Sequence, residues 1–533
     1  MTKYIFVTGG VVSGIGKGIS GASLGRLLKD RGLSVFMQKM DPYINVDPGT
    51  MSPYQHGEVF VTKDGGETDL DLGHYERFID EELTINSSIT SGKVYNSVIQ
   101  RERRGEYNGA TVQVIPHITD EIKNKVYSVA KQSGADVIIT EIGGTVGDIE
   151  SLPFIEAIRQ IHAENLKDDV LFIHTTLIPK VPSSGELKTK PTQHSYKELM
   201  SLGIKPDIFI IRSEDVITDE IKDKISLFCD VPVEAIVQSF NVDFIYEVPL
   251  SLKEQGLDDY VLDRLNLDLP DSDLQEWRSI VKRQKQASKT VTLGLVGKYV
   301  RLHDAYLSVS QALEDTASAL DHKVDIKWID SEEINEKNAS NILHGLDGII
   351  VPGGFGERGI EGMILASRYA REHGVPYFGI CLGMQIAVID LARHVCGLSG
   401  ADSLEFNEET PHPVIHLMKD QEEVTDRGGT LRLGNFECTL QEDTRAGRAY
   451  GTSTILERHR HRYEFNNAYR AQFEENGAVF SGLHTPLDLV EIVELADHPF
   501  FLGCQFHPEF RSRPNKIHPL FEAFVQASIE NKE

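Results

Sequence analysis

The stretch Gly9-Gly10-Val11-Val12-Ser13-Gly14-Ile15-Gly16-Lys17-Gly18 decides the fold of the first half of this sequence. It follows the apolar run 4–8, which predicts a buried strand, and it precedes residues 19–28, whose apolar spacing predicts a helix. Glycines let the backbone approach an anion closely, the helix start points N–H groups at it, and Lys17 adds a positive charge. The stretch therefore predicts a site for nucleotide phosphates. The alternative is a glycine-rich turn that only packs a helix against a sheet.

The loop departs from the common phosphate-loop pattern G-x-x-x-x-G-K-[ST] at two positions. Val11 occupies the first glycine position, and Gly18 replaces the hydroxyl residue that normally binds Mg²⁺. Carboxylates elsewhere must then hold the metal, because hard cations prefer oxygen ligands. Asp71 and Glu141 are the predicted pair, since Glu141 directly follows the predicted strand 136–140 and a glycine-rich segment comes next. The alternative for such acidic residues is a solvated surface.

Apolar runs that alternate with amphipathic stretches predict the fold class. In the first half, further strands are expected at 33–37, 112–115, 136–140, 170–174, 207–212 and 235–240, and in the second half at 291–297, 324–328, 347–351 and 375–380. This alternation is typical of α/β proteins with doubly wound, mostly parallel sheets, whose ligands bind at the carboxyl ends of the strands. The sequence thus predicts two such domains, residues 1–266 and 291–533, joined by a linker with some helix at 267–290.

Composition excludes several classes of protein. The chain has 533 residues and a formal net charge of −27, which argues against a surface that binds nucleic acid or anionic membranes without sequence preference. No apolar run is long enough to cross a membrane, and the N-terminal run lacks the pattern of a signal peptide, so a cytoplasmic protein is expected. The five cysteines include no C-x-x-C pair, which disfavours a disulfide framework and a zinc site.

A basic loop after the predicted strand 170–174 is the candidate for a second polyphosphate. Residues 180–193 carry three lysines and end in an amide, and a helix is expected to begin near Pro191 and Thr192. In an acidic protein, clustered lysines at a strand end favour a phosphate site, to which Lys224 could also contribute. Gln193 offers hydrogen bonds. The alternative is a solvated loop.

Three segments of the second half converge on one nucleophilic chemistry. Cys381 lies in Gly379-Ile380-Cys381-Leu382-Gly383-Met384-Gln385, where small residues flank a nucleophile at a predicted strand-to-helix turn. The C-terminal segment Gly503-Cys504-Gln505-Phe506-His507-Pro508-Glu509 supplies a base and a carboxylate to orient it. We therefore predict a triad of Cys381, His507 and Glu509, with the N–H groups of Gly354 and Leu382 as oxyanion donors. Cys229, Cys396, Cys438 and Cys504 are expected to fill the core.

These segments resemble the class I glutamine amidotransferase domain, and nearly the whole chain resembles the CTP synthase family. The first half contributes the segments SGIGKGI, DLDLGHYERF, EIGGTVGDIES and KTKPTQ, and the second half contributes GICLGMQ and FHPE. The resemblance implies an N-terminal synthase (amidoligase) domain and a C-terminal glutamine amidotransferase domain. It places ATP on Gly14, Ile15, Gly16, Lys17, Gly18, Ile19, Asp71, Phe240, Asn241 and Val242, with Mg²⁺ on Asp71 and Glu141.

The remaining ligand contacts also follow from the resemblance. UTP, or the product CTP, would bind Ser13, Asp148, Ile149, Glu150, Lys188, Thr189, Lys190, Pro191, Thr192, Gln193 and Lys224. Glutamine would bind Tyr54, Gly354, Leu382, Gly383, Met384, Gln385, Glu405 and Arg462. The segment 427–432 resembles the lid through which GTP activates glutamine use.

The resemblance implies a ligase that forms CTP. ATP would phosphorylate O4 of UTP, ammonia from glutamine would attack C4, and phosphate would leave, in a homotetramer that CTP inhibits by competing with UTP. A covered passage for neutral ammonia is expected near Tyr54 and His56. Two rival hypotheses are an amidoligase that acts on a carboxylate, which would have no use for the basic loop, and a regulatory or filament-forming nucleotide-binding protein. An intact triad argues against the second.

Overall fold

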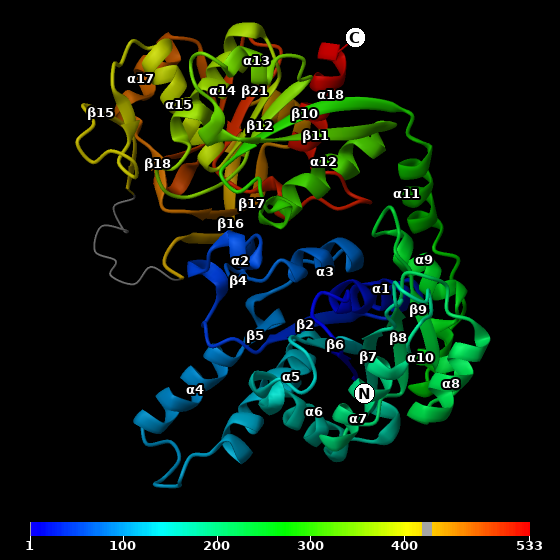
Figure 1. The fold of residues 1–533 in the computed structure, drawn as a ribbon. Helices are drawn as coiled ribbons and strands as arrows, with labels where there is room; N and C mark the ends of the chain where they lie inside the picture. Colours follow the sequence, from blue (N-terminus) through cyan, green and yellow to red (C-terminus); the bar gives the residue numbers. More distant parts are fainter. Residues whose placement is uncertain (1, 418–428, 533) are drawn as a thin grey trace. The chain divides into compact units, whose positions relative to one another are not determined.

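The computed structural model describes residues 2–417 and 429–532, which form two compact units. The first contains the chain up to Asp47 together with Asp71–Val281, and the second contains Pro48–Leu70 together with Lys282–Glu533. Figure 1 labels their elements.

The first unit is built on a sheet whose neighbouring strands all run parallel, in the order β5-β2-β6-β1-β7-β8-β9. Its central strands are apolar and buried on both faces, as parallel strands require when helices cover them. This confirms the predicted α/β class. The strands are β1 (Lys3–Gly9), β2 (Val35–Asp41), β5 (Ser88–Thr90), β6 (Val137–Ile142), β7 (Val170–Leu177), β8 (Ile208–Arg212) and β9 (Ile236–Ser239).

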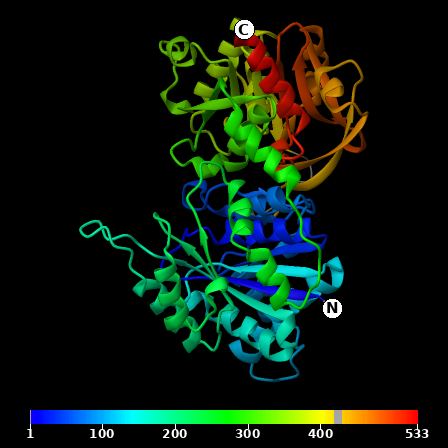
Figure 2. The same ribbon diagram turned by 90° about the vertical axis from the view of Figure 1, so that its right-hand side faces the viewer.

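Helices cover both faces of this sheet (Figures 1 and 2). On one face α1 packs against α3 and α9, and on the other α4, α5, α6 and α7 bury their apolar side chains against the strands. The helices are α1 (Lys17–Asp30), α3 (Asp71–Ile79), α4 (Ser91–Arg103), α5 (Thr119–Ser133), α6 (Leu152–Glu164), α7 (Lys190–Ser201), α8 (Asp219–Cys229), α9 (Glu247–Glu254), α10 (Leu257–Arg264) and α11 (Gln275–Gln286).

One predicted strand of this unit is wrong. Residues 112–115 are not a strand, because the chain forms a short π-helical turn at Val114–Ile118 that leads into α5. Val114 and Ile115 are 44% and 53% exposed, so this apolar run does not contribute to the core of its own unit. The sheet edge is formed instead by the short β5, which the sequence pattern missed because three residues are too few to show a period.

The second unit has a mixed sheet in the order β11-β10-β12-β13-β21-β20-β19-β16-β17. It is parallel from β11 to β21 and antiparallel from there to β17, so the parallel order expected from the sequence holds for its first part only. Antiparallel neighbours can be joined without a crossover helix, so the strand–helix alternation that predicts parallel order does not apply to these strands. The strands are β10 (Lys289–Gly297), β11 (His322–Asp330), β12 (Gly348–Val351), β13 (Tyr377–Ile380), β16 (Arg432–Leu440), β17 (Thr454–His461), β19 (Ala478–His484), β20 (Leu489–Leu495) and β21 (Phe501–Cys504).

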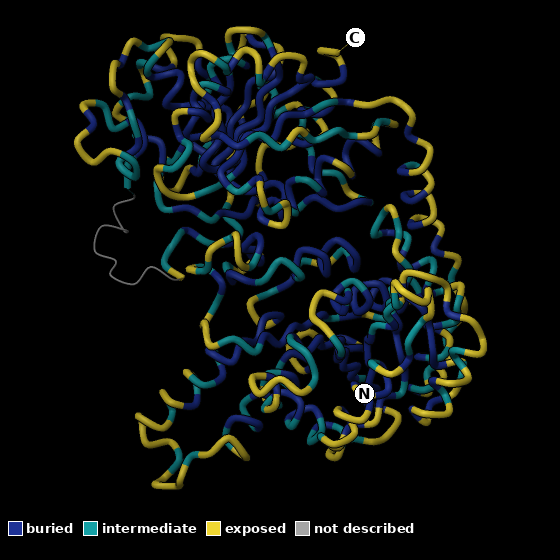
Figure 3. The backbone as a smooth tube through the Cα atoms, viewed as in Figure 1, coloured by how far each residue is buried: buried dark blue, intermediate teal, exposed yellow. Residues whose placement is uncertain are grey.

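Helices cover this sheet on both faces as well, and Figure 3 shows its central strands as buried. The helices α12 (Leu307–Ala319) and α18 (Pro519–Lys532) pack on one face, and α13 (Ala339–Leu343), α14 (Ile360–His373) and α15 (Leu382–His394) on the other. Smaller elements complete the unit: a three-stranded sheet of β14 (Ala401–Ser403), β15 (His412–Leu417) and β18 (Tyr463–Phe465), with α16 (Arg445–Tyr450) and α17 (Arg470–Glu475).

The segment 48–70 packs with the second unit although the chain on both sides of it belongs to the first. It contains α2 (Pro53–His56) and a hairpin of β3 (Phe60–Val61) and β4 (Glu67–Thr68). The Asn435 N–H donates to the Lys63 carbonyl at 2.9 Å, and Glu58 accepts from the Ser308 N–H at 2.9 Å. These contacts make the segment a part of the second unit. In the part of the chain that the structure describes, we find no helix that is long and apolar enough to cross a membrane.

Candidate active sites

Cys381 lies on a sharp turn between β13 and α15. Its backbone has φ 53° and ψ −102°, a conformation that is strained for any residue with a Cβ. The turn is held by the Cys381 N–H, which donates to the Cys504 carbonyl at 2.7 Å. Gly383 is required for its close packing, since an added Cβ there would lie 2.0 Å from the Val351 carbonyl oxygen. Strain of this kind is characteristic of nucleophile elbows.

His507 and Glu509 lie beside this turn. The His507 Nδ1 and the Glu509 Oε1 are 2.7 Å apart, and the imidazole stacks on Phe510. An added Cβ at Gly353 would lie 2.9 Å from His507 Cε1 and 3.8 Å from Cys381 Cβ, so the same glycine touches both. Burial alone lowers the pKa of His507, but the charge of Glu509 and the Cys381 sulfur outweigh it and raise the pKa to about 10. The imidazole is therefore held as its cation at neutral pH.

A cavity of about 620 Å³ opens over the three residues. All of its walls come from the second unit, including the segment 48–70. Polar side chains of Glu405, Arg460 and Arg462 face it, and it is large enough for a small polar ligand. The other lining residues are Gly49, Thr50, Met51, Pro53, Glu58, Val59, Tyr299, Ala305, Tyr306, Val309, Pro352, Gly353, Gly354, Phe355, Gly356, Leu431, Tyr463 and Phe510.

The loop 352–356 is fixed by two charged side chains. The Lys298 ammonium donates to the Phe355 carbonyl at 3.0 Å and to the Gly356 carbonyl, while the Gly356 N–H donates to Glu405 at 2.7 Å. Burial lowers the pKa of Lys298 to about 8 although Glu405 raises it, and burial raises the pKa of Glu405 although Lys298 lowers it. The carbonyls are thus turned toward Lys298.

In the first unit, the glycine-rich stretch connects β1 and α1. Gly14 and Gly16 have φ of 71° and 81°, values that favour glycine, and Gly16 stands at the start of α1. The Lys17 ammonium donates to the Ile142 carbonyl at 2.9 Å and to the Gly144 carbonyl. Burial lowers the pKa of Lys17, and Glu141 opposes this. The loop therefore has the left-handed turns, helix start and lysine that a phosphate site needs.

The two predicted metal carboxylates face the loop at the residue that lacks a hydroxyl. An added Cβ at Gly18 would lie 2.7 Å from Asp71 Oδ1 and 3.2 Å from Glu141 Oε2. Lys39 pairs with Asp71, and the Tyr75 hydroxyl donates to Glu141. Burial and the nearby Asp71 raise the pKa of Glu141. These hard oxygen donors, one of them destabilised as an anion, fit a divalent cation.

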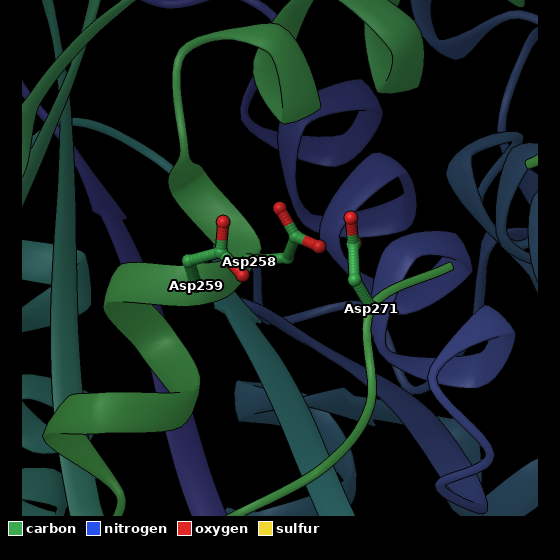
Figure 4. Close-up of side chains that lie close together, drawn as sticks. All are labelled: Asp258, Asp259 and Asp271. Carbon is green, nitrogen blue, oxygen red and sulfur yellow. The ribbon is translucent and has the colours of Figure 1, made fainter. Parts of the chain in front are cut away.

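Another acidic group, Asp258, Asp259 and Asp271, lies elsewhere in this unit (Figure 4). Arg31 contacts all three, at 2.6, 2.5 and 2.9 Å, and Lys253 pairs with Asp258 and Asp271 at 3.1 and 2.6 Å. Protein cations thus already compensate these carboxylates. The group ties α10 and the following loop to α1 and is not a candidate metal site.

Comparisons with known proteins cover both units. Residues 3–267 match the family model described as CTP synthase N-terminus, and residues 301–527 match that of class-I glutamine amidotransferase. The CTP synthase of Bacillus velezensis is 60% identical over 533 residues, 100% of both chains, and that of Caldanaerobacter subterraneus subsp. tengcongensis is 60% identical over 532 residues, 100% of this chain and 99% of that one. The chain belongs to the CTP synthase family. The resemblance that the motifs indicated is therefore confirmed.

A solved structure is similar to part of the chain. It is the glutaminase domain of Trypanosoma brucei CTPS with bound acivicin, which is 39% identical in sequence. The match covers 45% of this chain and 94% of the solved domain, with a TM-score of 0.43.

The UTP contacts expected for a CTP synthase fall into two groups in the first unit, of which the first is exposed and the second is partly buried, with Thr189, Thr192 and Gln193 buried. Ser13 and 148–150 are exposed, and Asp148 accepts from the Thr145 N–H at 2.8 Å. The second group follows β7 and starts α7, with Pro191 in the first helical turn. It comprises Lys188, Thr189, Lys190, Pro191, Thr192 and Gln193, and Lys224 lies exposed on α8.

A buried chain of polar groups links α7 to the phosphate loop. His174 on β7 contacts the Thr8 hydroxyl through Nδ1 at 2.9 Å and the Ser195 hydroxyl through Nε2 at 2.8 Å. Burial lowers the pKa of His174 to about 3, so it stays neutral and can both donate and accept. Because Thr8 precedes the glycine-rich stretch and Ser195 lies on α7, this chain fixes the two predicted phosphate sites relative to each other.

The segment 240–242, where the resemblance places adenine, follows β9 and is held by Arg212. Its guanidinium donates to the Phe240 carbonyl at 2.9 Å and to Asn241 Oδ1 at 2.5 Å. Val242 follows in the same loop. The backbone polar groups of a loop held in this way can form hydrogen bonds with the edge of an adenine base.

The predicted glutamine contacts differ in their relation to the cavity. Gly354, Glu405 and Arg462 line it, whereas Tyr54, Leu382, Gly383, Met384 and Gln385 are not among its lining residues. The Tyr54 hydroxyl donates to the Lys298 carbonyl at 2.7 Å, and its ring lies under Arg358. In the segment 427–432, Arg427 and Gly428 lie outside the described residues, and the Thr430 hydroxyl accepts from Arg462 at 2.8 Å.

Several residues at these sites were missed from the sequence. Lys298 and Arg212 each hold a loop, and each lies at or directly after the end of a strand. Tyr75 donates to Glu141 and lies in the quoted segment DLDLGHYERF. The strand-end position of Lys298, directly after the predicted strand 291–297, was a signal that could have been used. Arg460, whose guanidinium pairs with Glu67 at 2.9 Å, gave no signal, because its partner is 393 residues away in the chain.

Proposed function

We propose that the chain forms CTP from UTP in the cytoplasm, with ATP as the phosphoryl donor and glutamine as the source of ammonia. As a member of the CTP synthase family it is a ligase that forms a C–N bond. We assign synthesis to residues 1–266, glutamine hydrolysis to residues 291–533 and the connection to residues 267–290. The observation that carries the proposal is the convergence of Cys381, His507 and Glu509 on one cavity within a chain of this family.

Glutamine hydrolysis follows from the protonation state of the triad. The Cys381 thiolate attacks the carboxamide carbon of glutamine, and the resulting tetrahedral intermediate collapses as the His507 imidazolium donates its proton to the leaving nitrogen. Ammonia leaves, and a thioester joins Cys381 to the γ-carbonyl. Neutral His507 then takes a proton from water, whose oxygen attacks the thioester and releases glutamate, which restores the thiolate and the imidazolium.

The developing oxyanion needs donors that are already in place. The N–H of Leu382 is one of the helix-start groups of α15 that lack a partner inside the helix, and it adjoins the nucleophile. The N–H of Gly354 belongs to the loop whose carbonyls Lys298 fixes. Glu405 would hold the α-amino group of glutamine and Arg462 its α-carboxylate, since both charged groups face the cavity.

In the first unit, the phosphate loop would bind ATP, and the residues 188–193 with Lys224 would grip the triphosphate of UTP. Asp71 and Glu141 would hold Mg²⁺, which neutralises charge on the phosphates when bound. Lys17 would leave its carbonyl partners and bind the phosphates, as an ammonium seated between two carbonyls can do at little cost. Positioning and charge neutralisation are the main requirements of phosphoryl transfer.

Regulation and assembly belong to the same proposal. CTP would compete with UTP because both carry the same triphosphate, and GTP would activate glutamine use through the segment 427–432. UTP is expected to bind in a homotetramer, with the exposed Ile149 and its neighbours covered by another subunit.

The test separates the two halves through Cys381. Cys381→Ala should abolish formation of CTP from glutamine and preserve its formation from ammonium chloride, increasingly so at alkaline pH where more NH₃ is neutral. Lys17→Ala should lose both activities and serves as the matched control. Use of glutamine by Cys381→Ala would refute the triad, and failure with ammonium as well would refute the division of labour.

A further inference from the structure

Gln505 contacts the sulfur of the nucleophile. Its side-chain Nε2 donates to the Cys381 Sγ at 3.6 Å, and the residue is completely buried. It stands between the end of β21 and His507, and its backbone N–H donates to the Glu491 carbonyl at 2.8 Å. The glutamine mechanism derived above uses only His507 to stabilise the thiolate. A second, neutral donor therefore points at the reacting atom.

A second amide fixes which end of Gln505 faces the sulfur. The Gln385 Nε2, in the first turns of α15, donates to the Gln505 Oε1 at 3.3 Å and to the Tyr463 carbonyl at 3.2 Å. An amide whose oxygen is occupied by a donor must turn its own NH₂ to the other side. Gln385 thus directs the NH₂ of Gln505 toward Cys381.

The sulfur has different partners in its two protonation states. The thiol can donate to the Arg460 carbonyl, 3.8 Å from Sγ, and this contact is lost when the thiol ionises. The thiolate, in contrast, accepts from Gln505, and hydrogen bonds to charged acceptors are stronger than those between neutral groups. A donor that acts mainly on the anion stabilises the thiolate relative to the thiol.

We propose that Gln505 is a further residue of the catalytic site, which stabilises the Cys381 thiolate by an amide hydrogen bond whose direction Gln385 sets. The proposal deepens the glutamine hydrolysis proposed above and rests on it. A role in packing alone would make the shape of Gln505 important and its NH₂ irrelevant.

The experiment measures the rate at which iodoacetamide alkylates Cys381 between pH 5 and 10, followed by mass spectrometry of the peptide that contains it. Gln505→Met keeps the length of the side chain and removes the donor, so alkylation at pH 7 should slow by about tenfold or more and its pH profile should move upward. Gln505→Glu keeps the shape and adds a negative charge, so its profile should move further in the same direction. Gln385→Met should cause a smaller shift of the same sign.

The matched control is Gln311→Met, which removes a buried amide of the same unit that donates to Asp315 at 3.1 Å, away from the sulfur. It should leave the alkylation profile unchanged. A thermal unfolding curve like that of the wild type reports that each variant is folded. An unshifted profile in both Gln505 variants would overturn the proposal, as would equal shifts in Gln311→Met. Because alkylation needs no glutamine, this failure is distinct from failure of glutamine hydrolysis, which the Cys381→Ala assay reports.

Discussion

Replacement of Gly18 by alanine tests the arrangement of the synthase site. Sequence patterns of phosphate loops favour a serine or threonine at this position, so a small side chain would be expected to be harmless or to restore a metal ligand. The structure leads to the opposite expectation. An added Cβ would lie 2.7 Å from Asp71 Oδ1, where a normal contact needs about 3.4 Å or more, and 3.2 Å from Glu141 Oε2.

The size of the effect follows from what can move. Asp71 is held by its pairing with Lys39, and Glu141 lies on a buried strand and accepts from Tyr75, so neither carboxylate can retreat freely. Forcing an extra methyl group into such a site costs about 1–3 kcal/mol of folding free energy. A displacement of the carboxylates by several tenths of an ångström should cost more in activity, on the order of 10²-fold in CTP formation.

The assay compares CTP formation from glutamine and from ammonium in Gly18→Ala with glutamine hydrolysis alone. Both synthetic activities should fall together, and hydrolysis should persist because it resides in the other unit. Gly21→Ala is the matched control on the same helix, since an added Cβ there meets only ordinary contacts at 3.7 Å from Met37 and Val7. It should be neutral or stabilise the protein by about 1 kcal/mol through helix propensity.

Wild-type synthetic activity in Gly18→Ala would refute the assignment of Asp71 and Glu141 to a common site at this glycine. Equal losses in Gly18→Ala and Gly21→Ala would show that α1 tolerates no added methyl group, which would remove the special role of position 18.

Two further predictions concern the glutaminase site. Glu509→Gln removes the carboxylate that raises the pKa of His507, so glutamine hydrolysis should fall by about 10²–10⁴-fold. A raised histidine pKa stabilises the fold fully below pH 6.5, and this effect is lost as the pH rises toward about 10. Urea unfolding of the variant should therefore show a loss of stability at pH 6 that shrinks at pH 10. Similar stability of variant and wild type at pH 6 would contradict this. Lys298→Met leaves the Phe355 and Gly356 carbonyls without their ammonium and should slow hydrolysis by about 10²-fold. Since burial lowers the pKa of Lys298 to about 8, wild-type hydrolysis should decline above that pH with a step that Lys298→Met lacks, and an identical pH profile would contradict the role of its charge.

Local pattern was sufficient to predict the α/β class and the turns that carry the chemistry. The phosphate loop and the elbow at Cys381 are each encoded within about ten consecutive residues, where glycines, a strand and a helix start occur in fixed order. Such local patterns can be recognised without any knowledge of the tertiary structure. The proposal that Asp71 and Glu141 hold Mg²⁺ rests on a similar local signal, since Gly18 points to a missing ligand and Glu141 lies near the end of a strand.

Long-range pairing was not predictable. The packing of 48–70 with the second unit depends on contacts such as Glu58 with Ser308, 250 residues apart, for which the sequence has no local signal. The same holds for the antiparallel part of the second sheet, whose neighbours are decided by which strands meet, and for the expected strand at 112–115, where an apolar run alone gave the wrong secondary structure.

The placement of 48–70 bears on how one chain can serve two reactions. Glu67 on β4 accepts from Arg460, whose guanidinium lies over the Phe355 ring, and both Arg460 and Phe355 line the cavity beside Cys381. Asp71, which we propose holds Mg²⁺, comes four residues later as the first residue of α3. A connection of so few residues limits how far its two ends can move independently. We therefore expect a displacement of β4 to be felt at the start of α3 through the backbone itself.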